Sequence, residues 1–340
     1  MTSQFPTHPI ARLGGHNGPV HAVTYSAGLS QYILTGSTDR LIRLFNPNRA
    51  PPPDSTSSST TYQKDTSTPG LVQTYDAHGY EVLDIAVSDD NARFTSVGGD
   101  KTVFLWDVAS ARTLRRWSGH VGRINACSFG GAEGSVVVSG SYDGTVRLWD
   151  VKSQSHKPLM VFSEAKDSIS SVSVVDHEIM SGSIDGRVRV YDLRMGTIYI
   201  DVIGHPVTSL TPTNPSASLL VSSLDSTLRL MDKPDGKLLK AYKAPEYTNT
   251  DYRIRSTLGL NDSVVVSGSE SGLIFVWDLL EGTVLHKLRH AQPSTAQPHA
   301  ALNPKVSKKD VVSAVAFCKT RKEWVSAGGD GNVIVWGMPE

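Results

Sequence analysis

Residues 137–150 read VVSGSYDGTVRLWD, and this stretch decides the fold. Apolar residues alternate with polar ones on both sides of a turn built from Tyr142, Asp143 and Gly144. Such alternation around a Ser/Asp/Gly turn predicts an antiparallel β-hairpin, because successive side chains of a strand face opposite sides of a sheet. An aromatic residue, Trp149, follows Asp143 by six positions and completes the pattern.

Six further copies of this stretch make the chain a repeat protein. They occupy residues 33–46, 94–107, 179–192, 220–232, 265–278 and 324–337. The position of Asp143 is taken in the other copies by Asp39, Asp100, Asp185, Asp225, Ser271 and Asp330. Successive positions lie 61, 43, 42, 40, 46 and 59 residues apart, which is a base period of 40–45 residues with two insertions.

A repeat of this length has room for four strands, because alternating segments also flank each hairpin, for example at residues 124–129. One such sheet cannot bury a core by itself, so neighbouring sheets must pack face to face. We therefore predict an all-β, seven-bladed propeller formed by the whole chain, 1–340. Residues 10–13 are expected to close the ring as the outer strand of blade seven, paired with residues 333–336, which leaves no long free edge.

The composition excludes several classes of protein. The 340 residues carry 33 Lys+Arg and 33 Asp+Glu, and this balance argues against a dedicated nucleic-acid or membrane-surface binder. Two cysteines, Cys127 and Cys318, form no disulfide framework and no zinc-binding pair. The first ten residues lack the pattern of a signal peptide, and no run of 18 apolar residues occurs. We expect a reduced, soluble, intracellular protein without a cofactor.

A Gly-His pair followed 20–23 residues later by the turn aspartate, and then by Trp-Asp, resembles WD40 repeats. The histidines of this pattern are His16, His78, His120 and His205, with His290 after an arginine, whereas repeats four and six have none. Segments at 78–84 (HGYEVLD), 176–196 and 221–233 are similar to the mitogen-activated protein kinase organizer family, also called WD-repeat protein 83.

This resemblance implies a WD40 scaffold without enzyme activity. It would assemble protein partners in MAP-kinase signalling or in pre-mRNA splicing, as a component associated with the spliceosome, in the cytoplasm and the nucleus. We expect a monomeric propeller that contacts RNA only within a larger assembly and does not bind a membrane. One alternative is a substrate receptor of a cullin-type ubiquitin ligase, since residues 179–194 end in YDLR and fit the loose repeat pattern of such receptors.

A second alternative, an enzyme, rests on His120, Ser139 and Asp143, which suggest a catalytic triad. The same trio recurs as His16, Thr35 and Asp39 in the first repeat, and a triad has no need to be repeated. We predict instead a buried hydrogen-bond network that ties the loop entering each blade to its central hairpin. The network comprises His16, Asp39, His78, Asp100, His120, Ser139, Asp143, Trp149, Asp185, His205, Asp225 and Asp330. No metal-binding or phosphate-binding motif is found.

Loops that enter the innermost strands, and the turns of the central hairpins, lie on one face of a propeller, here called the upper face. Binding residues concentrate on such loops. By position, the candidates for partner binding are Tyr80 and Glu81 in blade two, Arg123, Asn125 and Tyr142 in blade three, and Arg253 and Arg255 in blade six. The competing interpretation is that these are ordinary solvated loop residues.

Two insertions interrupt the repeats. Residues 47–70 contain five prolines and ten Ser/Thr, so we predict disorder between the third and fourth strands of blade one. This segment is either an arm open to phosphorylation or a tolerated loop expansion. Residues 291–309 enter blade seven and hold Lys305, Lys308 and Lys309, which is weak evidence for nucleic-acid binding.

Overall fold

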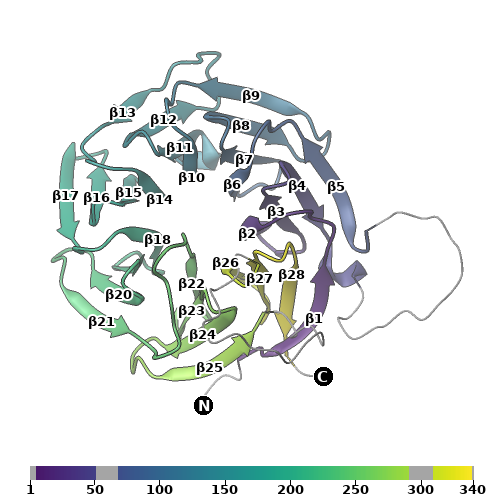
Figure 1. Ribbon diagram of the computed structural model, residues 1–340. Coiled ribbons are helices and arrows are strands. Elements are labelled where there is room, and N and C mark those ends of the chain that lie inside the picture. The colour runs from purple at the N-terminus through teal and green to yellow at the C-terminus, as the bar shows by residue number, and fades with distance from the viewer. Residues whose placement is uncertain (1–4, 51–67, 291–308, 339–340) are drawn as a thin grey trace, which may run out of the picture.

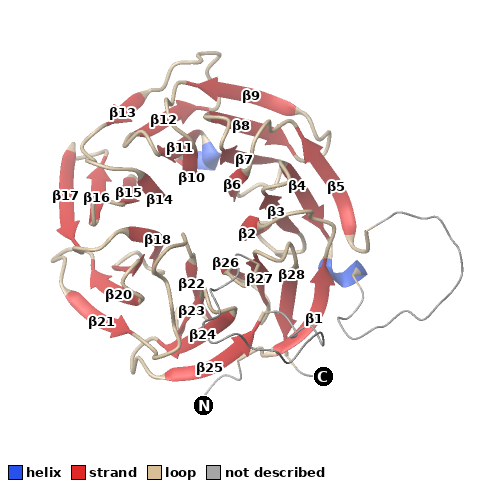
Figure 2. Ribbon diagram, viewed as in Figure 1, coloured by secondary structure: helices blue, strands red, loops and turns tan. Residues whose placement is uncertain are grey.

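The computed structural model describes residues 5–50, 68–290 and 309–338. It contains seven antiparallel sheets of four strands each, arranged as blades around a central channel (Figure 1). Figure 2 shows that strands and short connections account for nearly all of this part of the chain. The predicted seven-bladed propeller is confirmed.

Each blade is described here from the channel to the rim. Blade one contains β2 (Val20–Tyr25), β3 (Ile33–Ser37), β4 (Leu41–Phe45) and β5 (Leu71–Asp76). Blade two contains β6 (Val82–Val87), β7 (Arg93–Gly98), β8 (Thr102–Asp107) and β9 (Thr113–Ser118). Blade three contains β10 (Ile124–Gly130), β11 (Val136–Ser141), β12 (Val146–Asp150) and β13 (Met160–Phe162). Blade four contains β14 (Ile169–Val175), β15 (Glu178–Ser183), β16 (Arg187–Asp192) and β17 (Thr197–Val202).

The remaining blades follow the same order. Blade five contains β18 (Val207–Pro212), β19 (Ser218–Ser223), β20 (Thr227–Asp232) and β21 (Leu238–Tyr242). Blade six contains β22 (Ser256–Gly259), β23 (Val264–Gly268), β24 (Leu273–Asp278) and β25 (Val284–Arg289). Blade seven contains β26 (Val312–Phe317), β27 (Trp324–Gly328), β28 (Val333–Gly337) and β1 (His8–Leu13).

The ring closes through the N-terminal strand. β1 pairs antiparallel with β28, so that Leu13 lies opposite Val333. Beyond the strand, the carbonyl of Pro6 accepts a hydrogen bond of 2.8 Å from Nε1 of the buried Trp324. The predicted closing strand is confirmed and begins two residues earlier than expected, at His8.

The core lies between the blades, as a repeat that cannot bury its own faces requires. The second strand of each blade is almost wholly buried. In β11, for example, residues 137–141 are all buried. Gly140 in this strand faces the inner strand of the next blade, where an added Cβ would lie 2.5 Å from Cγ2 of Ile169. The glycine of the repeat is therefore a packing requirement between blades three and four.

Six of the seven innermost strands carry a β-bulge near their entry. The bulged residues are His21, Leu83, Asn125, Ser170, Thr208 and Ser313. A bulge re-aims a side chain out of the regular alternation, and at Asn125, Ser170 and Ser313 it directs a polar group toward the neighbouring blade. Ser170 Oγ donates to the Val207 carbonyl and Ser313 Oγ donates to the Val20 carbonyl, each at 2.5 Å. These bonds link adjacent blades around the channel.

The two insertions occupy the connections from β4 to β5 and from β25 to β26. At the start of the first, Pro47–Arg49 form a 3₁₀ helix whose N-cap, Asn46, accepts the N–H of Asn48. The predicted disorder is therefore wrong for these three residues, because the cap and a proline at the first helical position order them. Residues 51–67 and 291–308, with Lys305 and Lys308, lie outside the described part of the chain.

Candidate functional site

The predicted polar network is complete in blades two and three. In blade three, Trp149 Nε1 donates to Ser139 Oγ at 2.8 Å, and Ser139 Oγ lies 2.8 Å from His120 Nε2. The other ring nitrogen, Nδ1, lies 2.9 Å from Asp143 Oδ2. Blade two repeats this chain of bonds through Trp106, Ser96, His78 and Asp100.

In blade three the bonding pattern is that of a neutral His120 ring. The carboxylate accepts from Nδ1–H, so Nε2 accepts from the serine hydroxyl, which in turn accepts from the indole. Burial lowers the pKa of His120, and the hydrogen bond to Asp143 offsets this only in part. Ser139 is fully buried and has both neighbours in place, so it cannot reach a substrate. The trio is a structural tie and not a catalytic site.

Blades one and seven contain variants of the same network. His16 lies 2.7 Å from Thr35 Oγ1 and 2.9 Å from Asp39 Oδ2, and Arg43 also donates to Asp39 at 2.8 Å. In blade seven, Trp336 Nε1 donates to Ser326 Oγ, which lies 2.8 Å from His290 Nδ1. The ring is turned relative to blade three, because here Nε2 lies 3.5 Å from Asp330.

Arginine replaces histidine in blades four and five, which the sequence reasoning missed. The fully buried Arg189 pairs with Asp185 at 2.7 Å, and Arg229 pairs with Asp225 at 2.5 Å. The prediction that His205 belongs to the buried network is wrong: its side chain is 53 % exposed and only approaches Asp225, at 3.8 Å. The sequence does contain a signal for these arginines, since each lies two residues before the aromatic position of its repeat. Arg43 and Arg147 occupy the same position in repeats that also contain the network histidine, so this position alone does not identify a replacement.

Blade six uses a different residue again, Glu270. Its Oε1 accepts backbone N–H bonds from Thr250, Asp251 and Tyr252 at 2.7, 2.7 and 3.0 Å. Burial alone would raise the pKa of Glu270, but these bonds outweigh it and leave the pKa lowered. As a carboxylate, Glu270 therefore holds the loop of residues 250–252, which leads to Arg253.

Arg253 and Arg255 lie inside the channel and cross it from blade six. Arg255 pairs with Asp84 of blade two at 2.7 Å and donates to the Leu83 carbonyl at 2.8 Å. Arg253 donates through Nη1 to the carbonyl of Asn125 in blade three at 2.5 Å. Neither arginine projects from the upper face, contrary to prediction, because each finds an acceptor across the channel.

Asn125 is likewise buried, contrary to its predicted place among the partner-binding residues. The bulge turns its side chain toward blade four, where Nδ2 donates to Ser168 Oγ at 3.0 Å and to the Ile169 carbonyl at 2.7 Å. The bulge therefore draws the Asn125 amide inward, between blades three and four, and away from the upper face.

Arg123 and Tyr142 meet on the upper face, as the sequence suggested. The guanidinium carbon of Arg123 lies 5.4 Å from the centroid of the Tyr142 ring, a cation–π contact. Both side chains are exposed, Tyr142 by 59 %. In blade two, Tyr80 is 64 % exposed and Glu81 is half-buried. Together these four residues are called the rim here.

The two crossing arginines divide the channel into an upper and a lower chamber. The upper chamber has a volume of about 410 Å³, and the lower one about 450 Å³. Arg253 and Arg255 line both, whereas Asp84 lines only the lower chamber. The rim residues Glu81 and Arg123 line the upper chamber, so it opens onto the exposed face.

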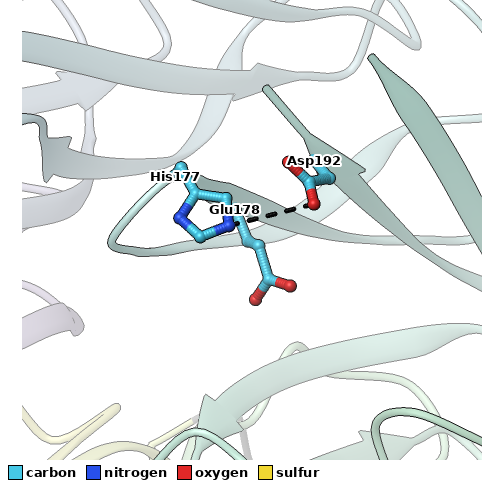
Figure 3. A group of neighbouring side chains, drawn as sticks. All are labelled: His177, Glu178 and Asp192. Carbon is cyan, nitrogen blue, oxygen red and sulfur yellow. Dashed lines mark ion pairs between the residues drawn. The ribbon is translucent and has the colours of Figure 1, made fainter. Parts of the chain in front are cut away.

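One group outside the channel has the residue types of a metal site. His177, Glu178 and Asp192 lie together at one end of the blade-four hairpin (Figure 3). Two of the three have partners outside the group: Glu178 pairs with Lys233, and Asp192 accepts the N–H groups of Arg194 and Met195. His177 lies 3.8 Å from Asp192. Local structure therefore accounts for the group without a cation. Among the described residues, no helix has the length and apolar character to cross a membrane.

Comparison with known proteins gives consistent matches. The family model described as WD domain, G-beta repeat matches residues 7–46, and that of Nucleolar protein 10-like, N-terminal domain matches residues 80–279. WD repeat domain-containing protein 83 of Homo sapiens is 42 % identical over 281 residues, covering 83 % of this chain and 82 % of that protein. The protein of that name in Danio rerio is 37 % identical over 334 residues, covering 98 % and 93 %. A Dictyostelium discoideum homolog is 28 % identical, covering 91 % and 95 %.

Proposed function

Because the chain belongs to the family of WD repeat domain-containing protein 83, whose members are WD40 propellers, we propose that it assembles protein partners on its upper face. WD40 propellers are typically non-catalytic interaction scaffolds, and the only triad-like groups found in the described chain are structural ties. The observation that carries the proposal is the contact of Arg123 with Tyr142, exposed beside the upper chamber.

The rim has the chemistry of an interface anchor. Tyrosine and arginine are the residue types that most often carry binding energy, because they combine apolar area with directed hydrogen bonds. Here the tyrosine ring holds the guanidinium in place, so less side-chain entropy is lost on binding. The rigid hairpin of β11 and β12 positions both groups, with the Tyr142 N–H donating to the Arg123 carbonyl at 2.9 Å.

For the partners, we propose components of a MAP-kinase module or of the spliceosome. The support for this is the family relationship alone. The proposal places the protein in the cytoplasm and the nucleus, with protein contacts as the primary ones and RNA contacts confined to a larger assembly.

Affinity purification followed by mass spectrometry tests this function. The tagged full chain is compared with Arg123→Ala/Tyr142→Ala and with Arg194→Ala, a control at an exposed turn of blade four. We expect kinases or splicing factors to be captured by the parent and by the control, and to be depleted for the rim variant. Equal capture by all three proteins would place the interface elsewhere, and capture of a cullin-ligase adaptor would favour the receptor alternative.

A further inference from the structure

The upper chamber carries an excess of positive charge. Three of the described residues that line it are arginines, Arg123, Arg253 and Arg255, and Glu81 is the only acid among them. Arg255 has its own counter-charge, because it pairs with Asp84 from the lower side at 2.7 Å. The other two guanidinium groups face the chamber without such a partner.

Arg253 is the more unusual of the two. It is half-buried, and its one hydrogen bond among the described residues goes to a neutral carbonyl, that of Asn125. Its Nε is buried without an acceptor, and no carboxylate of residues 5–50, 68–290 or 309–338 lies within ion-pairing distance. The charge of Asp84 stabilises Arg253 only at longer range, because that carboxylate is already paired with Arg255. Arg253 therefore has no counter-ion of its own, and a charge partly withdrawn from water without one is costly.

Acidic residues next to the chamber in sequence do not neutralise this charge. Asp251 and Asp310, which precede the chamber residues Tyr252 and Val311, are exposed, and neither forms an ion pair with a chamber arginine in the described part of the chain. Burial, and then the charge of Arg255, lowers the pKa of Arg253 to about 9, so it stays protonated at neutral pH. Burial and the charge of Arg253 also lower the pKa of His21, across the chamber, to about 4. The chamber is therefore a region of positive potential.

We propose that the upper chamber binds an oxyanion, a carboxylate or a phosphate group presented by an extended segment of a partner protein. Arg253 forms the floor of this site and Arg123 its entrance. This inference rests on the proposed function and specifies the chemistry of the partner. Arginine suits the task, because its planar fork matches carboxylate and phosphate oxygens. Tyr142, at the entrance, offers a ring face to the peptide around the acidic group.

Fluorescence anisotropy with three labelled peptides tests the site directly. The peptides share a Gly/Ser backbone and differ at two central positions, which carry phosphoserine, glutamate or serine. We expect the full chain to bind one or both acidic peptides at least tenfold more tightly than the serine peptide, with inorganic phosphate as a competitor. The phosphoserine and glutamate arms decide which oxyanion is preferred.

Variants of the chamber arginines test whether the preference for acidic peptides arises in the upper chamber. Arg253→Met should abolish it, Arg123→Gln should reduce it severalfold, and Arg194→Gln should leave it unchanged. Melting temperatures are measured for each variant, and the exposed Arg123→Gln keeps the test valid where Arg253→Met is poorly folded.

The inference would be overturned by equal binding of all three peptides, or by a preference that survives both chamber variants. Binding of a single-stranded RNA oligonucleotide in place of the peptides, with the same dependence on Arg253, would also overturn it. Depletion of partners by the rim variant alongside equal binding of the three peptides would refute the oxyanion site and leave the proposed function intact.

Discussion

Residues 123–125 read Arg-Ile-Asn and residues 253–255 read Arg-Ile-Arg, yet the two segments end in different places. In both, the isoleucine is fully buried at the entry to an innermost strand. Arg123 lies exposed over Tyr142, whereas Arg253 and Arg255 are drawn into the channel. The same local pattern therefore supplies a surface anchor in blade three and cross-channel links in blade six.

The two blades also differ at the first residue of the central hairpin turn. In blade three this residue is Tyr142, whose ring supports Arg123 at the surface. In blade six it is Glu270, which has no aromatic ring to support an arginine and instead binds the backbone of residues 250–252. Blade six also lacks the bulge, since β22 pairs regularly with β23 from Ser256. Its arginines then find acceptors in blades two and three.

Breaking the cross-channel link should produce the largest effect. Asp84→Ala leaves Arg255 without its counter-charge and removes the acceptor of the Ile85 and Cys127 N–H groups. We expect a loss of about 3–5 kcal/mol in the free energy of unfolding, as for one member of a buried ion pair. Denaturant titration measures it, with the exposed Asp89→Ala as the control at about 0.5 kcal/mol or less. Equal losses for the two variants would show that the link does not hold the channel together.

Breaking the network beneath the surface anchor should come next. Asp143→Ala removes the acceptor of His120, of the Val121 N–H and of Thr145, so we expect a loss of about 2–4 kcal/mol. Ser271→Ala, at the matching position of blade six, should cost about 0.5 kcal/mol or less, because no histidine bonds to it. Similar denaturant midpoints for the two variants would refute the pairing argument.

A smaller loss is expected from Glu270→Gln, which sharpens the comparison. Glutamine keeps the shape but loses the charge that three backbone N–H groups share, so the free energy of unfolding should fall by about 1–2 kcal/mol. Hydrogen exchange of residues 250–252 should accelerate more than that of the β11–β12 turn. Unchanged exchange at residues 250–252 would show that Glu270 does not hold this loop.

The repeats make the fold predictable. The alternation of apolar residues in each hairpin, the aspartate of its turn and the period of the repeat all predict the same four-stranded blade. The histidine networks follow for the same reason wherever His16, His78 or His120 is present. The replacements by Arg189, Arg229 and Glu270 do not follow, since they depend on which charged group packs against the turn in three dimensions. The inward turn of Asn125, Arg253 and Arg255 depends on contacts between blades far apart in sequence, which no local pattern records.

Calorimetric titration of the rim variant Arg123→Ala/Tyr142→Ala tests most directly whether Arg123 and Tyr142 belong to the partner-binding surface. The titrant is the partner identified by mass spectrometry, and the parent and Arg194→Ala are measured beside it. We predict binding at least tenfold weaker for the rim variant, about 1.4 kcal/mol, with a melting temperature within a few degrees of the parent. Unchanged affinity in a folded rim variant would contradict this assignment and place the contact surface elsewhere on the propeller.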